Sequence, residues 1–79
     1  MTCALHLILL HKWYDLIDQG KKKTEYRDNT PYWHKRFFEN PPDIIIFHRG
    51  YTKKTMSFLV TRITVKDDKI AIKLGAREK

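Results

Sequence analysis

One stretch decides the fold of this chain: Gly20-Lys21-Lys22-Lys23-Thr24-Glu25-Tyr26-Arg27. Glycine is suited to end a helix, because it adopts a left-handed backbone without a steric penalty. An extended chain after it would place Lys23, Glu25 and Arg27 on one face. The other face would carry Lys22, Thr24 and Tyr26. We therefore predict a helix before Gly20 and a strand after it, with the face that bears Glu25 directed outward or into a cleft.

Apolar residues dominate the chain before this stretch. Residues 4–10 are apolar on both alternating faces, which predicts a central strand buried on both sides or closed in a barrel. From His11 onward the period changes, since Trp13, Leu16 and Ile17 recur at helical spacing. This pattern predicts a short amphipathic helix that begins near His11 and is capped by Gly20.

The chain after the stretch predicts one more helix and three strands. Thr30 followed by Pro31 is typical of a helix start, with threonine as N-cap and proline at the first helical position. Asn40-Pro41-Pro42 ends that helix. Strands are predicted for residues 43–47, 55–65 and 70–74, with tight turns at 48–51 and 66–69 and a stop at Gly75.

This order of elements predicts an α+β fold. The 79 residues suffice for a single domain, residues 1–79, with a small core. Because a flat sheet of this size would leave costly edges, we expect a small mixed β-barrel of about five strands with two short helices. The large aromatic residues expected in the core are Trp13, Phe37, Phe47 and Phe58, together with Trp33, for which stacking on an unpaired base is the alternative.

The charge of the chain favours an anionic partner. Sixteen Lys and Arg residues against nine Asp and Glu residues give a formal net charge of +7. Such an excess attracts nucleic acid or another acidic surface. A basic surface on a small soluble domain is the alternative. Between positions 20 and 54 the basic residues are Lys21, Lys22, Lys23, Arg27, Lys35, Arg36, Arg49, Lys53 and Lys54.

The sequence favours a cytoplasmic location. Cys3 is the single cysteine, which excludes an internal disulfide and suits a reducing compartment. The apolar run at residues 4–10 is too short to span a bilayer and has no basic start typical of a signal peptide. No spacing of His, Cys, Asp or Glu indicates a metal site, and no cofactor motif is present.

Four motifs follow one another along the chain: Gly20-x-Lys22-x-x-Glu25-x-Arg27, Pro31-Tyr32-Trp33, Phe47-His48-Arg49-Gly50-Tyr51 and Ile72-Lys73-Leu74-Gly75. In this order they resemble the ASCH domain family, a branch of the PUA-like β-barrel superfamily, and its compact members from bacteria and phages. The resemblance covers nearly the whole chain. It implies a PUA-like barrel, a cleft lined by residues 22–27 and an association with RNA.

The leading hypothesis is therefore an RNA-binding module with a basic cleft. Glu25 would read a base, because a carboxylate only accepts hydrogen bonds and base edges carry N–H donors. The alternative for Glu25 is an ion pair with Lys23 or Arg27. The other candidates contact phosphates or stack on bases. The full set is Lys22, Lys23, Glu25, Tyr26, Arg27, Arg49, Tyr51, Lys53 and Lys54.

Two other hypotheses stay open. One is a small amidohydrolase or ribonuclease-like enzyme acting on modified nucleosides or RNA. One branch of the family removes the acetyl group of N4-acetylcytidine with a lysine, a threonine and a glutamate, which correspond here to Lys22, Glu25 and a position on or near Lys73. Lys22 and Glu25 would then be the catalytic pair. The other hypothesis is a phage or bacterial accessory protein that binds an acidic protein partner.

A histidine in the predicted turn at residues 48–51 adds a further possibility. His48 could act as an acid or base in a ribonuclease-like reaction, because imidazole titrates near neutral pH. The alternative is a turn histidine whose ring is hydrogen-bonded to the backbone. We predict that His48 is such a turn histidine.

Overall fold

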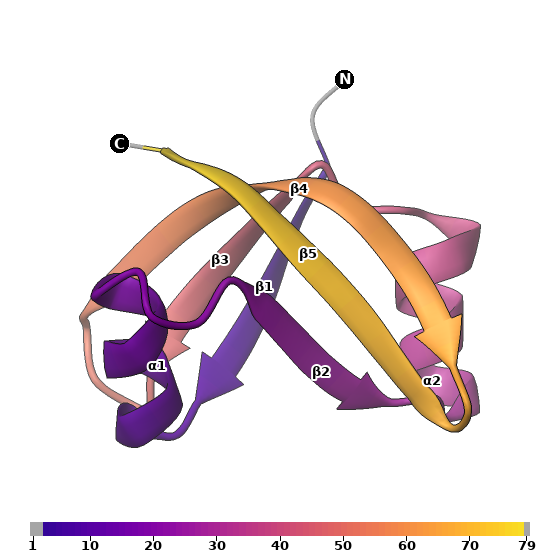
Figure 1. Ribbon diagram of the computed structural model, residues 1–79, viewed down its shortest axis with the longest axis horizontal. Helices are drawn as coiled ribbons and strands as arrows, with labels where there is room; N and C mark the ends of the chain where they lie inside the picture. The colour runs from indigo at the N-terminus through magenta and orange to yellow at the C-terminus, as the bar shows by residue number, and fades with distance from the viewer. Residues whose placement is uncertain (1–2, 79) are drawn as a thin grey trace.

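A computed structural model describes residues 3–78 of the chain (Figure 1). Five strands and two short helices follow the predicted order, and the second helix continues as a wider π-type turn, η1. Their bounds are β1 (Ala4–Leu9), α1 (His11–Asp18), β2 (Thr24–Asp28), α2 (Pro31–His34), η1 (Lys35–Glu39), β3 (Ile44–Arg49), β4 (Thr55–Lys66) and β5 (Lys69–Glu78). Within residues 3–78 no helix is long and apolar enough to cross a membrane.

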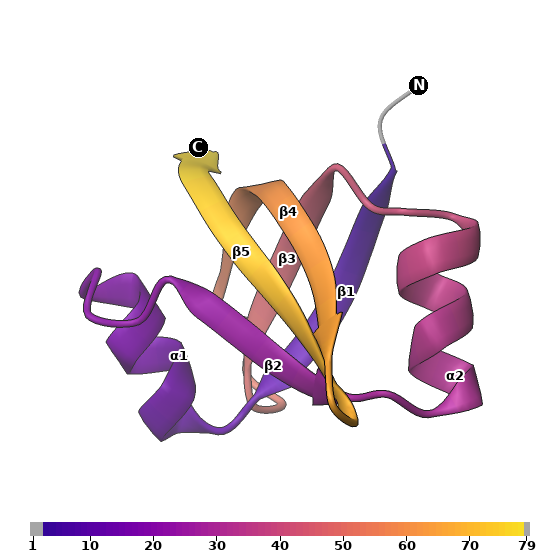
Figure 2. The same ribbon diagram turned by 45° about the vertical axis from the view of Figure 1, so that its right-hand side comes forward.

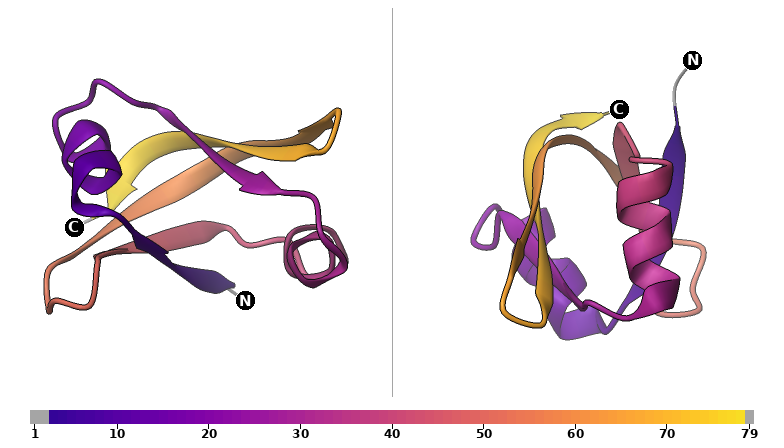
Figure 3. Two further views of the ribbon diagram at one scale, coloured as in Figure 1. Left: turned by 90° about the horizontal axis from the view of Figure 1, so that it is seen from below. Right: turned by 90° about the vertical axis from the view of Figure 1, so that its right-hand side faces the viewer.

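The strands form one mixed sheet that is curled into a half-barrel, which confirms the predicted fold class. Their spatial order is β1-β3-β4-β5-β2, with β1 parallel to β3 and the other pairs antiparallel. β1 and β2 are therefore the two edges of the sheet. The helices α1 and α2 lie at opposite ends of the curled sheet (Figures 1 and 2). Seen from below, β1 and β2 pass between them (Figure 3).

The core confirms three of the predicted aromatic residues and corrects a fourth. Phe37, Phe47 and Phe58 are buried, but Trp13 is 37% exposed and its neighbour Tyr14 is fully buried in its place. Helix α1 presents Tyr14 and Ile17 to the sheet, so Trp13 stands at the flank of the buried face. The buried set is Leu7, Leu9, Tyr14, Ile17, Phe37, Ile45, Phe47, Met56, Phe58, Ile70, Ile72 and Leu74.

Strand β1 is an edge strand, so the prediction of a central strand buried on both sides is wrong. Its inward residues Leu7 and Leu9 are buried, whereas Ile8 is 48% exposed and Leu10 is 71% exposed. The apolar run resembled a central strand because both faces carry aliphatic side chains. Pairing with β3 alone leaves its other edge without a strand partner and the side chain of Ile8 exposed.

The helix ends were predicted correctly, and they fix the ends of β2. Gly20 has a φ of +76°. Its N–H donates to the Ile17 carbonyl at 3.0 Å, and the Lys21 N–H donates to the Leu16 carbonyl at 2.9 Å, which is a Schellman cap. At the other end Thr30 Oγ1 accepts from the Trp33 N–H at 3.3 Å. Strand β2 is therefore held between two chemically defined helix ends.

Strand β3 runs further than predicted, through His48 and Arg49, which pair with Ile8 and Leu9 of β1. The tight turn begins only at Gly50, whose φ is +58°. His48 is thus a strand residue, and its ring contacts a histidine of β1 instead of the backbone that was predicted. The parallel pairing of β1 and β3 supplies the hydrogen bonds that extend the strand.

Strand β5 passes through Gly75 to Glu78, so the predicted stop at this glycine is wrong. Instead the glycine lies where β4 bends, between register shifts at Phe58/Val60 and Val60/Arg62. A Cβ atom at position 75 would stand 2.6 Å from Thr61 Cγ2. The glycine allows the two long strands to approach closely at this bend, which curls the sheet (Figure 1).

Substituting Gly75→Ala is expected to lower the free energy of unfolding by about 1–3 kcal/mol, because the new methyl group overlaps Thr61 Cγ2. Adding Thr61→Ser should recover most of that loss. Serine lacks Cγ2 but keeps the hydroxyl that donates to the Lys73 carbonyl at 3.1 Å. Urea denaturation of the two variants and of Thr61→Ser alone measures the effect. Equal losses in the single and double variants would contradict the steric explanation.

Candidate nucleic acid interface

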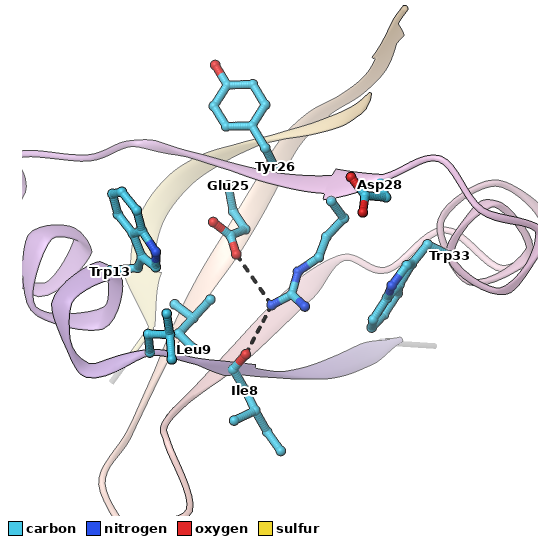
Figure 4. A pocket seen from close by; sticks show the side chains of 9 residues that line it. Ile8, Leu9, Trp13, Glu25, Tyr26, Asp28 and Trp33 are labelled. Atoms are coloured by element: carbon cyan, nitrogen blue, oxygen red, sulfur yellow. Dashed lines mark hydrogen bonds and ion pairs between the residues drawn. The ribbon is translucent and has the colours of Figure 1, made fainter. Parts of the chain in front are cut away.

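A pocket of about 310 Å³ opens where the two edges of the sheet face each other. Strand β2 supplies one side of this edge pocket, β1 supplies the other, and the two helices contribute a tryptophan each (Figure 4). The lining residues are Ile8, Leu9, Leu10, Trp13, Glu25, Tyr26, Arg27, Asp28 and Trp33. The pocket therefore exists because the barrel is left open between β1 and β2.

Glu25 is the charged residue at the centre of the edge pocket. It is 5% exposed, and within residues 3–78 it is the one polar or charged residue in the buried class. Its Oε1 lies 3.3 Å from Lys22 Nζ, and its Oε2 lies 3.4 Å from Arg27 Nη2. Burying a carboxylate costs free energy unless it is paired, and here each oxygen has one cation. The side chain points into the space between Trp13 and Trp33 (Figure 4).

Arg27 links the two edges of the sheet. Its Nη2 donates to the Ile8 carbonyl of β1 at 3.1 Å, while the same group contacts Glu25. The carbonyl is available because β1 has no neighbouring strand on that side. In the described part of the chain the buried Nε of Arg27 has no hydrogen-bond partner. This Nε–H is therefore a buried donor without a partner.

Two aromatic rings form the side walls of the edge pocket. Trp13 comes from α1 and Trp33 from α2, and they are the two tryptophans of the chain. Lys12 and Lys22 lie over the Trp13 ring, with Nζ 4.7 and 4.6 Å from its centroid. The Arg27 guanidinium lies 5.2 Å from the Trp33 centroid. Because a cation lies over each ring, the walls of the edge pocket are both aromatic and positively charged.

Both tryptophans were expected in the core, and the structure revises this. Trp13 is exposed at the pocket, and Trp33 is half-buried, packed on one side against the core. Trp33 contacts Phe37 on the core side, with ring centroids 5.8 Å apart. A helical wheel centred on Tyr14 and Ile17 would have placed Trp13 at the flank of the helix.

The structure brings together four of the predicted nucleic-acid contacts. Lys22, Glu25 and Arg27 form one ion-paired cluster. Lys22 lies before the first residue of β2, so the alternation of side chains along the strand does not direct it away from Glu25. Lys22 therefore forms the ion pair with Glu25 for which Lys23 was the expected partner. Lys23 is exposed and does not line the edge pocket. Tyr26 is 57% exposed at the rim, with its ring pointing away from Glu25 (Figure 4).

The other four candidates lie at the end of β3 and in the loop that follows it, and they do not line the edge pocket. Arg49 is engaged elsewhere, since its Nε and Nη2 donate to the two carboxylate oxygens of Asp15 at 2.9 and 3.0 Å. Lys54 lies 5.9 Å from the ring centroid of Tyr14 on the same helix. Lys53 is exposed, and Tyr51 is 94% exposed. Arg49 and Lys54 therefore contact helix α1, whereas the side chains of Tyr51 and Lys53 remain accessible to solvent.

The Arg49 guanidinium holds the pKa of Asp15 below its usual value, chiefly through their hydrogen bonds. Because the folded-state pKa is depressed, the pair stabilises the fold above the unfolded pKa near 3.8, and this stability is lost as the pH falls through the folded pKa. Asp15→Asn is expected to unfold at lower urea concentration than the wild type at pH 7. Below pH 3.8 the two midpoints should converge; a constant difference would contradict this account.

Neither a scan against models of known protein families nor a search of curated proteins finds a match to this chain.

Proposed function

We propose that the protein binds single-stranded RNA and takes one base into the edge pocket. The observation that carries this proposal is the buried Glu25 carboxylate between two tryptophan rings, at the open edge of a strongly basic domain. A purely structural ion pair would not need aromatic walls and an open pocket around it. A base inserted there would stack on a ring and present its edge to the carboxylate.

Guanine suits the carboxylate best. Each oxygen of Glu25 has one cation beside it and keeps a further lone pair, since a carboxylate can accept about four hydrogen bonds. The ring N1–H and the exocyclic amine of guanine are adjacent donors that point in the same direction, and they match the two oxygens. We infer a preference for guanine over bases that lack this donor pair.

The phosphates would follow the cations at the rim. A base that stacks on Trp13 would displace Lys12 or Lys22 from the ring, and the displaced ammonium group would then lie near its phosphate. These contacts supply affinity without reading sequence. The resemblance to the ASCH family supports an RNA ligand. As part of the same proposal, we infer that the protein acts in the cytoplasm.

Catalysis is the weaker hypothesis for the edge pocket. Lys22 and Glu25 neutralise each other at 3.3 Å, and no serine, threonine or cysteine is among the lining residues. Lys73, at the position of the family's glutamate, pairs with Thr24 in the sheet and is exposed. These features favour binding over hydrolysis.

The test is a titration of a short, labelled, guanine-containing single-stranded RNA at several salt concentrations. We expect log K to fall steeply with log salt, and Lys22→Ala to lower the magnitude of the slope by about 1 unit. Lys73→Ala is the matched control, because this exposed lysine lies on β5 between the buried Ile72 and Leu74 and so faces away from the core. Absence of binding at low salt, or equal effects of both variants, would overturn the proposal.

Two mononucleotides separate base reading from charge attraction. GMP and IMP differ only by the exocyclic amine that is assigned to Glu25, so GMP should bind about tenfold to a hundredfold more tightly, as expected for one hydrogen bond to a charged group. Equal affinities would remove the reading role of Glu25, while leaving phosphate binding intact.

A further inference from the structure

Two histidines far apart in the sequence meet on the outer face of the sheet. His6 of β1 and His48 of β3 are 42 residues apart, and parallel pairing of the strands brings His6 Nδ1 to 2.8 Å from His48 Nε2. Their ring centroids are 5.0 Å apart. Both side chains alternate with buried neighbours, Leu7 and Phe47 among them, so they point away from the core.

Two imidazole nitrogens at this distance share one proton, which one ring donates and the other accepts. A metal ion can replace that proton and bind both lone pairs, after the nitrogens separate by a fraction of an ångström. His6 is exposed and His48 is half-buried, so their rings can move by that amount. Neutral imidazole is a common protein ligand for metal ions, and it suits zinc, nickel and copper.

The surroundings leave room to complete the coordination. A second pocket, of about 500 Å³, is lined by His6, Ile8, His48, Gly50, Tyr51 and Thr52. Among residues 3–78 no third His, Cys, Asp or Glu joins these two in a metal-binding group. Water or an exogenous anion would therefore occupy the remaining positions, as in sites that keep open coordination positions.

We propose that His6 and His48 form a site for one divalent transition-metal ion of the zinc, nickel or copper class. Two protein ligands and a net charge of +7 keep the affinity for a cation modest. The proposal does not depend on RNA binding, because this second pocket shares only Ile8 with the edge pocket.

The experiment titrates the full chain with Zn²⁺ by calorimetry at pH 7.5. Zinc is chosen because it has no redox chemistry and leaves Cys3 intact. One ion per chain should bind, and His6→Asn and His48→Asn should each weaken binding at least about tenfold. His34→Asn is the matched control, since His34 is exposed and its ring contacts Asn29 instead of another histidine.

A second measurement follows the histidine ring resonances of the wild-type chain by NMR during the same titration. The signals of His6 and His48 should shift together, with saturation at one equivalent, while that of His34 stays in place. Binding that survives in both His6→Asn and His48→Asn, or zinc shifts confined to other residues, would overturn the proposal. Failure to bind zinc at 100 µM would do the same.

Discussion

Replacing Glu25 by glutamine is expected to weaken the binding of GMP at least about tenfold, the cost of losing a hydrogen bond to a charged group. Glutamine has the same shape but offers one carbonyl oxygen and an NH₂ group, so one of the two guanine donors would face another donor. The substitution also leaves the cations Lys22 and Arg27 without their common partner.

Loss of the carboxylate is also expected to reduce stability by about 1–3 kcal/mol, because two partly buried cations lose their counter-charge. Isothermal titration with GMP and urea denaturation measure the two effects separately. Glu39→Gln, the same change at an exposed position at the end of η1, serves as the control. A folded Glu25→Gln variant that binds GMP as tightly as the wild type would exclude Glu25 as the base reader.

Phe37→Ala is expected to lower the free energy of unfolding by about 3–5 kcal/mol, the usual cost of removing a fully buried ring. Phe37 anchors the helical segment that carries Trp33, and their ring centroids are 5.8 Å apart. A 79-residue domain has a small margin of stability, so this one change should unfold a large fraction of the molecules at 37 °C.

Phe38 provides the internal control for that prediction. It is the next residue on the same segment, but it is only half-buried against the core. Phe38→Ala should therefore cost clearly less, and circular dichroism at increasing urea concentration compares the two variants. Equal losses would mean that the segment is held by general apolar contact and not by insertion of the Phe37 ring.

Local chemistry explains which parts of the fold were predictable. Gly20 and the pair Thr30-Pro31 act through backbone geometry and capping within a few residues, and both lie where the sequence indicated. Strand order depends on pairing between distant segments. Residues 4–10 therefore indicated a buried strand without revealing that it lies at an edge. Gly75 indicated the end of a strand, whereas the strand continues and the close approach of Thr61 is what requires a glycine there.

The same distinction applies to the candidate site. Glu25 and Arg27 were predictable as a unit because two residues of one strand share a face. The Ile8 carbonyl, the two tryptophan walls and the His6–His48 contact were not, since each depends on how elements far apart in the sequence meet. Arg49 was selected for its charge, and only the fold shows that Asp15 holds it.

The most direct test of base binding in the edge pocket uses the chain's own fluorescence. Its two tryptophans both line this pocket, so a stacked base must change their emission. Titration with GMP should quench the emission saturably, at the dissociation constant that calorimetry gives, and Trp13→Phe and Trp33→Phe should each remove part of the signal. Binding of GMP with unchanged tryptophan emission would contradict the proposed site.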